Sequence, residues 1–294
     1  MASNTTQLTP PPPAAITASV RAALAEDIGS GDLTAALLPE TQQALATVIT
    51  REAAVLCGRD WVDAVFAALD PAVVIDWHCR DGDPAAAGQK LCELRGPARS
   101  ILTGERTALN FLQTLSAVAT ATRHYIAAVA GTRATILDTR KTIPGLRLAQ
   151  KYAVRVGGGS NHRIGLYDGI LIKENHIVAA GGITPAVRRA RDQGTMVLLE
   201  VEVETLDQAE EALRAGADRL LLDNFSTALM RDAVALRDRL APGIGLEASG
   251  GIELQSIRAV AETGIDFISI GDLTKNIRAI DLSMRFSFIA APTP

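Results

Sequence analysis

The residues best suited to chemistry gather in one central segment, between positions 137 and 176. Seven Lys or Arg residues lie there against three acids, a local net charge of +4 in a chain whose formal net charge is -4. Two short apolar runs, Thr135–Leu137 and Ile170–Ile172, lead into the charged sequences Asp-Thr-Arg-Lys and Lys-Glu-Asn-His. Buried parallel strands end in this way where they reach the functional edge of an α/β sheet. The segment therefore predicts the docking of an anion.

A loop with its own pair of cations lies between these two runs. It reads GGGSNHR at positions 157–163 and ends in His162 and Arg163. Taken singly, each piece has a more ordinary explanation, because Lys and Arg are mostly exposed and a glycine-rich loop is more often a mobile connection than a ligand site. The order and spacing of the pieces carry more information than any one of them.

Three motifs in this order, DTRKTIPGLR, GGGSNHRIGL and ILIKENH, closely resemble the quinolinate phosphoribosyltransferase family. GERTALN at 104–110 and EDIGSGDLTA at 26–35 match the family as well, and the similarity extends over about residues 20–283. The resemblance implies an enzyme that transfers phosphoribosyl from 5-phosphoribosyl-1-pyrophosphate to quinolinate with decarboxylation. Its products would be nicotinate mononucleotide, CO2 and pyrophosphate, in de novo NAD biosynthesis.

The chain before the central segment predicts an α+β domain built on an antiparallel sheet. Residues 1–15 are rich in Ser, Thr and Pro and are interpreted as a disordered Pro-rich arm. Helical spacing follows over Thr17–Glu26 and again over Trp61–Leu69. The segments 45–57 and 73–102 contain short apolar or alternating pieces separated by turn sequences, which is typical of antiparallel strands.

These elements place the amino-terminal sheet domain at residues 16–115. The segment Glu105–Ala130 is expected to form one or two helices that lead out of the domain. At the other end of the chain, Asp281–Ile289 carries apolar residues at period 2, which predicts a strand. We expect residues 281–294 to return to the amino-terminal sheet.

Residues 116–280 are predicted to form a parallel (β/α) barrel. Apolar residues make up 48% of the chain and aromatic residues only 4%, so the core must consist mainly of small aliphatic side chains, which favours an α/β fold. The expected strands are Thr135–Leu137, Ile170–Ile172, Val197–Val203, Arg219–Leu222, Ile244–Ala248 and Phe267–Ile270. The expected helices between them include Ala186–Gln193, Leu206–Ala215, Thr227–Leu240 and Glu253–Thr263. Six strands indicate an incomplete barrel, and the family resemblance implies seven.

Acidic residues mark the ends of two neighbouring barrel strands, where the working groups of such barrels lie. Glu200, Glu202 and Glu204 alternate with Val and should face the barrel interior and mouth, because carboxylates are poorly tolerated against the outer helices. Glu202 and Asp223 together offer two hard oxygen ligands suited to Mg²⁺. A rim held by salt bridges is the structural alternative.

Two glycine-bearing loops follow the last barrel strands. Ser249, Gly250 and Gly251 come after one strand, and Ile270 and Gly271 close the next. Such loops leading into helices form phosphate sites in this fold. The pattern predicts a phosphorylated ligand and does not identify the reaction.

The cations divide into two sets that suit two different anions. The planar or aromatic set, Arg140, His162 and Arg163, suits a dicarboxylate, because a guanidinium grips a carboxylate with two bonds. Lys141 and Lys173 are point charges that suit a pyrophosphate. The resemblance adds Thr139 to the substrate-binding residues and implies that the catalytic residues are Lys141, Lys173, Glu202 and Asp223.

Arg106 is expected in the first turn of a helix, where spare backbone N–H groups favour an anion. An ordinary exposed arginine is the alternative. The resemblance implies that Arg106 enters the quinolinate site of a neighbouring subunit, in a homodimer or a larger assembly.

Composition also limits the classes of protein. Three cysteines without a Cys-x-x-Cys pair disfavour a disulfide framework or a zinc site and fit a reducing cytosol. No segment approaches the roughly 20 apolar residues of a membrane span, and no signal peptide is recognisable. No long basic stripe suggests nucleic-acid binding. We expect a cytoplasmic protein that binds neither membranes nor nucleic acids.

Other functions stay open on these patterns alone. The phosphate loops would serve a barrel aldolase or isomerase equally well, with Lys173 as a Schiff-base residue. A non-catalytic binder of a phosphorylated metabolite is a second alternative. A sister family of the same fold that acts in molybdenum transport fits less well, because the full set of dicarboxylate cations is present.

Overall fold

The structure of the protein is a computed structural model that describes residues 8–289 and has two compact units. Unit 1 contains the chain up to Arg123, the segment Thr142–Gly158 and the chain from Thr274 onward. Unit 2 contains His124–Lys141 and Gly159–Leu273. The predicted domain boundary at 115/116 falls inside a continuous helix, and the two units divide eight residues later.

Unit 1 is built on a four-stranded antiparallel sheet with the order β12-β1-β5-β3. The strands are β1 (Gln43–Thr50), β3 (Val74–Trp77), β5 (Lys90–Pro97) and β12 (Leu282–Ile289). Every second residue of β1 is buried, which is the pattern of a strand with one face on the core. Pairing of β12 with β1 along its whole length confirms the predicted return of the carboxyl-terminal strand.

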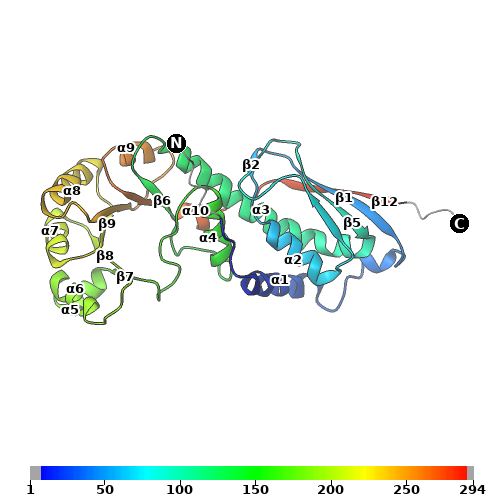
Figure 1. The fold of residues 1–294 in the computed structure, drawn as a ribbon, viewed down its shortest axis with the longest axis horizontal. Helices are drawn as coiled ribbons and strands as arrows, with labels where there is room; N and C mark the ends of the chain where they lie inside the picture. The colour runs from blue at the N-terminus through cyan, green and yellow to red at the C-terminus, as the bar shows by residue number, and fades with distance from the viewer. Residues whose placement is uncertain (1–7, 290–294) are drawn as a thin grey trace. The chain divides into compact units, whose positions relative to one another are not determined.

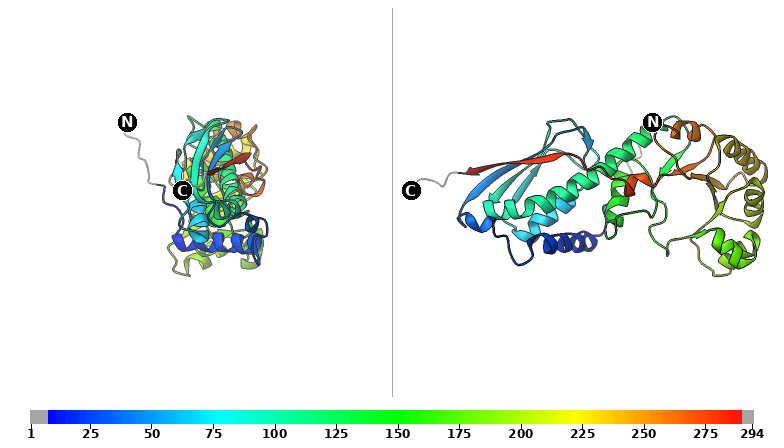
Figure 2. Two further views of the ribbon diagram at one scale, coloured as in Figure 1. Left: turned by 90° about the vertical axis from the view of Figure 1, so that its right-hand side faces the viewer. Right: turned by 180° about the vertical axis from the view of Figure 1, so that it is seen from behind.

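Helices α2 (Arg59–Leu69) and α3 (Ala98–Ala128) cover one face of this sheet (Figures 1 and 2). The remaining elements of unit 1 are α1 (Pro13–Ile28), a 3-10 turn at Ala35–Leu37, α4 (Arg147–Val156) and the short pair β2 (Ala54–Val55) and β4 (Pro84–Ala85). Helix α1 begins at Pro13, inside the predicted arm, because proline's fixed φ suits the first helical turn. Residues 1–7 of that arm lie outside the described residues.

The start of α3 corrects one prediction. The helix begins at Ala98 and runs for 31 residues, so Arg106 lies eight residues beyond its start and not in the first turn. Its backbone N–H is therefore not one of the spare groups of a helix end. Gly104 packs closely inside the helix: a Cβ there would lie 2.6 Å from a ring carbon of Phe66.

Unit 2 contains a six-stranded parallel sheet with the order β6-β11-β10-β9-β8-β7. Its strands are β6 (Thr135–Leu137), β7 (Gly169–Ile172), β8 (Leu198–Val203), β9 (Arg219–Asp223), β10 (Gly245–Ser249) and β11 (Phe267–Ser269), which confirms the six predicted strands. Within the described residues, β6 and β7 do not pair, so the sheet is not closed into the seven-stranded barrel that the resemblance implies. The loop before β7 forms one isolated β-bridge beside β6, between Ser160 and Leu137.

Helices lie along the outer side of this curved sheet (Figure 1). They are α5 (Glu174–Ala180), α6 (Ile183–Arg191), α7 (Leu206–Ala215), α8 (Thr227–Leu240) and α9 (Ile257–Ala261). The short α10 (Asp272–Lys275) follows β11 at the point where the chain leaves unit 2. The hydroxyls of Thr205 and Ser226 accept backbone hydrogen bonds at the starts of α7 and α8, so these two helices match their predicted bounds. Helix α9 is shorter than predicted and begins at Ile257 rather than Glu253.

Two predictions about composition can be compared with the structure. The three cysteines are free and buried, as expected. No helix in the described part of the chain combines the length and the apolar character needed to cross a membrane.

Gly157 should be sensitive to substitution because it packs against the backbone of α3. It caps α4 in an ordinary right-handed conformation, but a Cβ would lie 2.5 Å from the carbonyl oxygen of Ala119 and 2.5 Å from Cβ of Thr122. We expect Gly157→Ala to lower the free energy of unfolding by roughly 1–3 kcal/mol, measured by urea titration. Gly243→Ala is the control, since no atom lies within 4 Å of its Cβ position. A stabilised Gly157→Ala protein would contradict the close packing.

Candidate active site

A cavity of about 400 Å³ opens at the carboxyl ends of the parallel strands of unit 2. Nine of the fourteen residues predicted for the site line it: Thr139, Arg140, Lys141, His162, Arg163, Lys173, Glu202, Asp223 and Ser249. They come from the ends of neighbouring strands and from the loop before β7. The sheet thus brings together residues that are up to 110 positions apart in the sequence.

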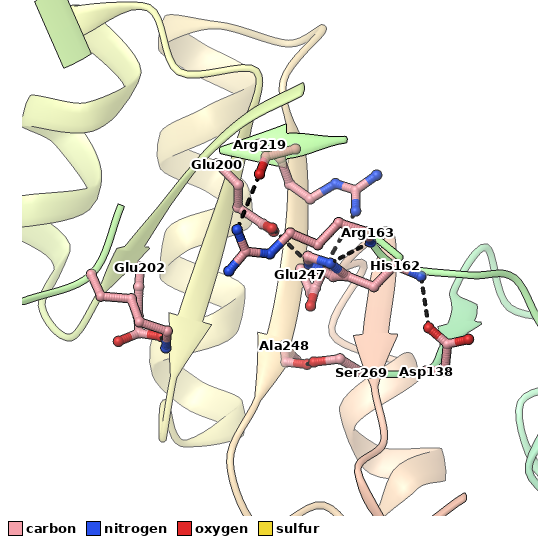
Figure 3. Close-up of polar contacts among 11 residues, drawn as sticks. Asp138, His162, Arg163, Glu200, Glu202, Arg219, Glu247, Ala248 and Ser269 are labelled. Carbon is pink, nitrogen blue, oxygen red and sulfur yellow. Dashed lines mark hydrogen bonds and ion pairs between the residues drawn. The ribbon is translucent and has the colours of Figure 1, made fainter. Parts of the chain in front are cut away.

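The end of β6 fixes the loop that carries two of the cations. Asp138 is fully buried, and its carboxylate accepts hydrogen bonds from the backbone N–H of His162 (2.9 Å) and from Nδ2 of Asn161 (2.5 Å). Figure 3 shows Asp138 beside His162. Charge-assisted bonds of this kind hold a loop more firmly than neutral ones. The predicted flexible loop is therefore anchored at its polar end.

Both ring nitrogens of His162 have partners within the protein. Nδ1 accepts the backbone N–H of Arg163 at 2.7 Å, and Nε2 lies 2.7 Å from Oε2 of Glu200. Because Nδ1 accepts, the proton must sit on Nε2, which donates it to the carboxylate. His162 is therefore the neutral Nε2–H tautomer in this arrangement, rather than a third cation facing the cavity.

Glu200 and Glu247 form a buried pair of carboxyl groups inside the sheet (Figure 3), with exposures of 1% and 0%. Burial raises the pKa of Glu200. Burial, together with the negative charge of Glu200, raises the pKa of Glu247 to about 8, although His162 and Arg219 act in the opposite direction. Glu247 is consequently protonated at neutral pH.

Arg219 supports this pair from the start of β9. Its Nη1 donates to Oε2 of Glu247 at 3.2 Å, and its guanidinium stacks at 3.9 Å from the ring centroid of Phe267. His162, Glu200 and Glu247 also offer three ligand atoms within 4.8 Å of one another. The guanidinium charge already beside Glu247 disfavours a metal ion at that position.

The predicted metal ligands lie in the same cavity. Glu202 forms an ion pair with Nζ of Lys173, and Asp223 accepts a hydrogen bond from Nδ2 of Asn224 at 2.8 Å. Partial burial and the charge of Glu202 raise the pKa of Asp223, against the effect of Lys173 and Lys141. Two acids that repel each other across adjacent strands form an oxygen-donor set that suits a hard divalent cation.

The cations of the cavity differ in the groups that hold them in place. Nη1 of Arg163 donates to the carbonyl of Gly169 at 3.0 Å, and burial and the charge of Arg140 lower the pKa of Arg163. The backbone N–H of Lys141 donates to the hydroxyl of Thr139, which shapes the turn after β6. Two neighbouring arginines that repel each other are well suited to an anion with two negative groups.

The glycine loops contribute less to the cavity than predicted. Ser249 lines it, whereas Gly250, Gly251, Ile270 and Gly271 do not. Gly250 instead allows a close approach, since a Cβ there would lie 2.2 Å from Oδ1 of Asn224. The loop after β10 also does not lead directly into a helix, because α9 begins only at Ile257.

Arg106 belongs to unit 1 and is exposed on α3. Among the described residues it makes no hydrogen bond or ion pair. Its proposed place in a neighbouring subunit's site stays a prediction.

Sequence reasoning missed four residues that line the cavity: Leu171, Leu221, Glu247 and Ser269. Glu247 carried a detectable signal, because a single acid within the apolar strand sequence GLEAS must either face the interior with a partner or be exposed. The same reasoning had been applied to Glu200 and Glu202. The partners themselves, Arg219 and His162, could not be identified from spacing.

Comparison with known proteins identifies the family of both parts of the chain. The family model of the quinolinate phosphoribosyltransferase N-terminal domain matches residues 32–116, and that of the C-terminal domain matches residues 118–285. A protein of Bacillus subtilis named probable nicotinate-nucleotide pyrophosphorylase (carboxylating) is 45% identical over 88% of this chain and 89% of its own length. A Mycobacterium leprae protein of the same activity name is 41% identical over 90% of this chain and 95% of its own.

The fold is similar to that of a solved relative. The structure of the nicotinate-nucleotide pyrophosphorylase from Francisella tularensis superposes with a TM-score of 0.92 at 48% identity. The match covers 97% of this chain and all of that one.

Proposed function

The chain belongs to the quinolinate phosphoribosyltransferase family, and we propose that it carries out the family's reaction in the cavity of unit 2. The protein is a pentosyltransferase that transfers phosphoribosyl from 5-phosphoribosyl-1-pyrophosphate to quinolinate, with release of CO2 and pyrophosphate. The product, nicotinate mononucleotide, enters NAD biosynthesis. One observation carries the assignment of the cavity: nine residues predicted from the motifs and from the strand ends line it together.

The cavity offers separate groups for the two substrates. Arg140 and Arg163 would each grip one carboxylate of quinolinate, and Lys141 and Lys173 would meet the pyrophosphate as point charges. His162 belongs to the wall of this site. Its ring nitrogens would have to leave Arg163 and Glu200 before they could bind a substrate, so its role in the proposal is to shape the cavity.

Glu202 and Asp223 would hold Mg²⁺, the ion with which we expect the diphosphate substrate to bind. The fit is supported by the donor set, two carboxylates with oxygen ligands in one cavity, and by the raised pKa of Asp223 beside Glu202. When bound, such an ion neutralises part of the charge of the diphosphate. Lys173, paired with Glu202, is close enough to share that task.

The chain's own residues then act mainly by placement. The arginines would align the ring nitrogen of quinolinate with the ribose carbon, and the lysines would take up charge on the departing pyrophosphate. No covalent enzyme intermediate is required. Once ribosylated, the ring is a pyridinium whose positive nitrogen stabilises the electron pair left on the adjacent carbon when the carboxylate departs as CO2, and a proton from water then takes the place of the carboxylate on that carbon.

A homodimer with Arg106 in the partner's site completes the proposal. Arg106 is an exposed cation without a partner among the described residues of its own chain, which supports a ligand elsewhere. Unit 1 also exposes the large apolar side chains of Leu33 (86%), Leu37 (82%) and Val74 (65%), which contact with a partner subunit would bury. A cytoplasmic location stays a prediction, supported by three buried free thiols.

The reaction is tested directly with the purified protein. Given quinolinate, 5-phosphoribosyl-1-pyrophosphate and Mg²⁺, it should release CO2 and form nicotinate mononucleotide, detected by chromatography. Turnover of nicotinate but not of quinolinate would overturn the assignment. Omission of either substrate is the control.

The metal assignment predicts the behaviour of two variants. Glu202→Gln and Asp223→Asn should each raise the Mg²⁺ concentration needed for half-maximal rate and lower kcat by roughly 100-fold or more, because both ligands stabilise charge on the leaving group. Quinolinate affinity should stay nearly unchanged. Glu204→Gln is the matched control, since Glu204 is exposed at the end of the same strand. Unchanged Mg²⁺ dependence in both variants would reassign the acids to salt bridges.

The shared-site dimer predicts complementation between two inactive variants. Arg106→Ala and Lys141→Ala proteins should each be nearly inactive as homodimers. Refolded together at equal amounts, half of the dimers are mixed, and each mixed dimer has one intact site of two, so activity should recover to about a quarter of wild type. If mixed dimers form and no activity returns, Arg106 acts within its own chain or not at all.

A further inference from the structure

We propose that Glu247 is a positioning residue for the dicarboxylate subsite and acts through Glu200 and His162 on Arg163. This inference rests on the proposed function, because it assigns a support to the arginine that would grip quinolinate. It extends that function, since none of the motifs includes Glu247. Four successive contacts in the interior of unit 2 join Arg219 to Glu247, Glu247 to Glu200, Glu200 to His162 and His162 to Arg163.

The contacts among Arg219, Glu247 and Glu200 lie beneath the cavity. Arg219 donates to Oε2 of Glu247 and stacks on Phe267, so the guanidinium holds one carboxyl oxygen in place. Glu247 lies on β10 and Glu200 on β8, one on either side of β9 (Figure 3). Each carboxyl group is almost completely buried, and neither can turn toward water.

The remaining contacts connect this pair to the cavity wall. Nε2 of His162 lies 2.7 Å from Glu200 and 3.6 Å from Oε2 of Glu247, so one ring N–H faces both carboxyl groups. Nδ1 then accepts the N–H of Arg163. A ring turned by 180° about the Cβ–Cγ bond would present Cε1 to the carboxyl groups and Cδ2 to the N–H of Arg163, so both hydrogen bonds would be lost. The pair therefore determines the orientation of the residue on which Arg163 depends.

A proton on Glu247 supplies a hydrogen-bond donor that the two buried carboxyl groups otherwise lack. As two carboxylates, the pair leaves Oε1 of Glu200 and Oε1 of Glu247 buried without a donor. A protonated Glu247 supplies a donor to Glu200, whose Oε2 accepts the N–H of His162. Such a bond also avoids two adjacent negative charges in a buried site.

The charged and titratable groups around Glu247 come from each neighbouring element. Burial and the charge of Glu200 on β8 raise its pKa, whereas the His162 ring, Arg219 and a hydrogen bond from Ser269 on β11 lower it. The resulting pKa of about 8 means that the proton is present at pH 7 and is lost as the pH rises through 8. Above that pH the pair repels, and His162 loses its support.

Two substitutions at Glu247 test this role. Glu247→Leu removes the hydrogen bonds, and we expect it to raise the KM for quinolinate by roughly 10- to 100-fold while the KM for 5-phosphoribosyl-1-pyrophosphate changes by less than about threefold. Glu247→Gln has the shape and bonding of the protonated acid. It should restore the quinolinate KM to within about threefold of wild type at pH 7.

The pH profile separates positioning from acid catalysis. In the wild type the KM for quinolinate should rise above about pH 8, the pKa of Glu247, and in Glu247→Gln this rise should disappear because an amide cannot ionise. Loss of kcat in Glu247→Gln at an unchanged KM would instead make Glu247 a proton donor, and the positioning role would be wrong. Equal increases in both KM values in Glu247→Leu would also overturn it.

A measurement without substrate keeps this inference separate from the proposed function. The chain has only four histidines, so the ring ¹⁵N signals of His162 can be assigned with a His162→Gln variant. At pH 7 the wild type and Glu247→Gln should show the Nε2–H tautomer, and Glu247→Leu a mixture. A wild type that shows this tautomer but does not turn over quinolinate would refute the proposed function alone. A mixture in the wild type would refute the positioning role.

Discussion

Two carboxyl groups buried inside the parallel sheet set the main constraint on the active-site geometry. Removing a carboxylate from water is costly unless charges and hydrogen bonds compensate. Around Glu200 and Glu247 the compensation comes from Arg219 below and His162 beside the pair. Each compensating group is itself held, Arg219 by the Phe267 ring and His162 by its backbone bond to the end of β6. The charges beneath the cavity thus fix the loop that forms its wall.

The parallel sheet explains why the mouth combines acids and bases within a small volume. Neighbouring strands lie roughly 4.8 Å apart, so one polar residue at the end of each strand produces a row of close side chains. Lys173, Glu202 and Asp223 occupy successive positions of this row, and the ion pair of the first two leaves the second acid beside a negative neighbour. Burial and this negative neighbour together raise the pKa of Asp223. Because this row contains a lysine and two acids, it suits a phosphate ligand with a bound cation better than it suits a phosphate alone or a cation alone.

The sequence predicted the regular elements of unit 2 well and the start of α3 poorly, for different physical reasons. Buried parallel strands are continuous apolar runs ended by charges, so the predicted bounds of β6 match the structure to the residue. Helices α7 and α8 also match their predicted bounds, and in the structure the hydroxyls of Thr205 and Ser226 accept backbone hydrogen bonds at their starts. The start of α3 depended on tertiary packing. Gly104 signals a break from local propensity alone, but in the fold it lets α3 approach Phe66 closely. No local pattern contains that contact.

The same limit applies to the site. The sequence gives the type of each residue, whereas the direction of its hydrogen bonds, which sets the protonation of His162, depends on the fold. The motifs supplied His162 as a third cation for a dicarboxylate, because residue type does not reveal protonation. The bonds at Nδ1 and Nε2 make the ring neutral and turn it toward the interior. With His162 removed from the positive charges, Arg140 and Arg163 provide two guanidinium groups for the two carboxylates of the proposed substrate. The match of charges is closer than the one that the sequence suggested, and it requires that the buried pair keep His162 in its present orientation.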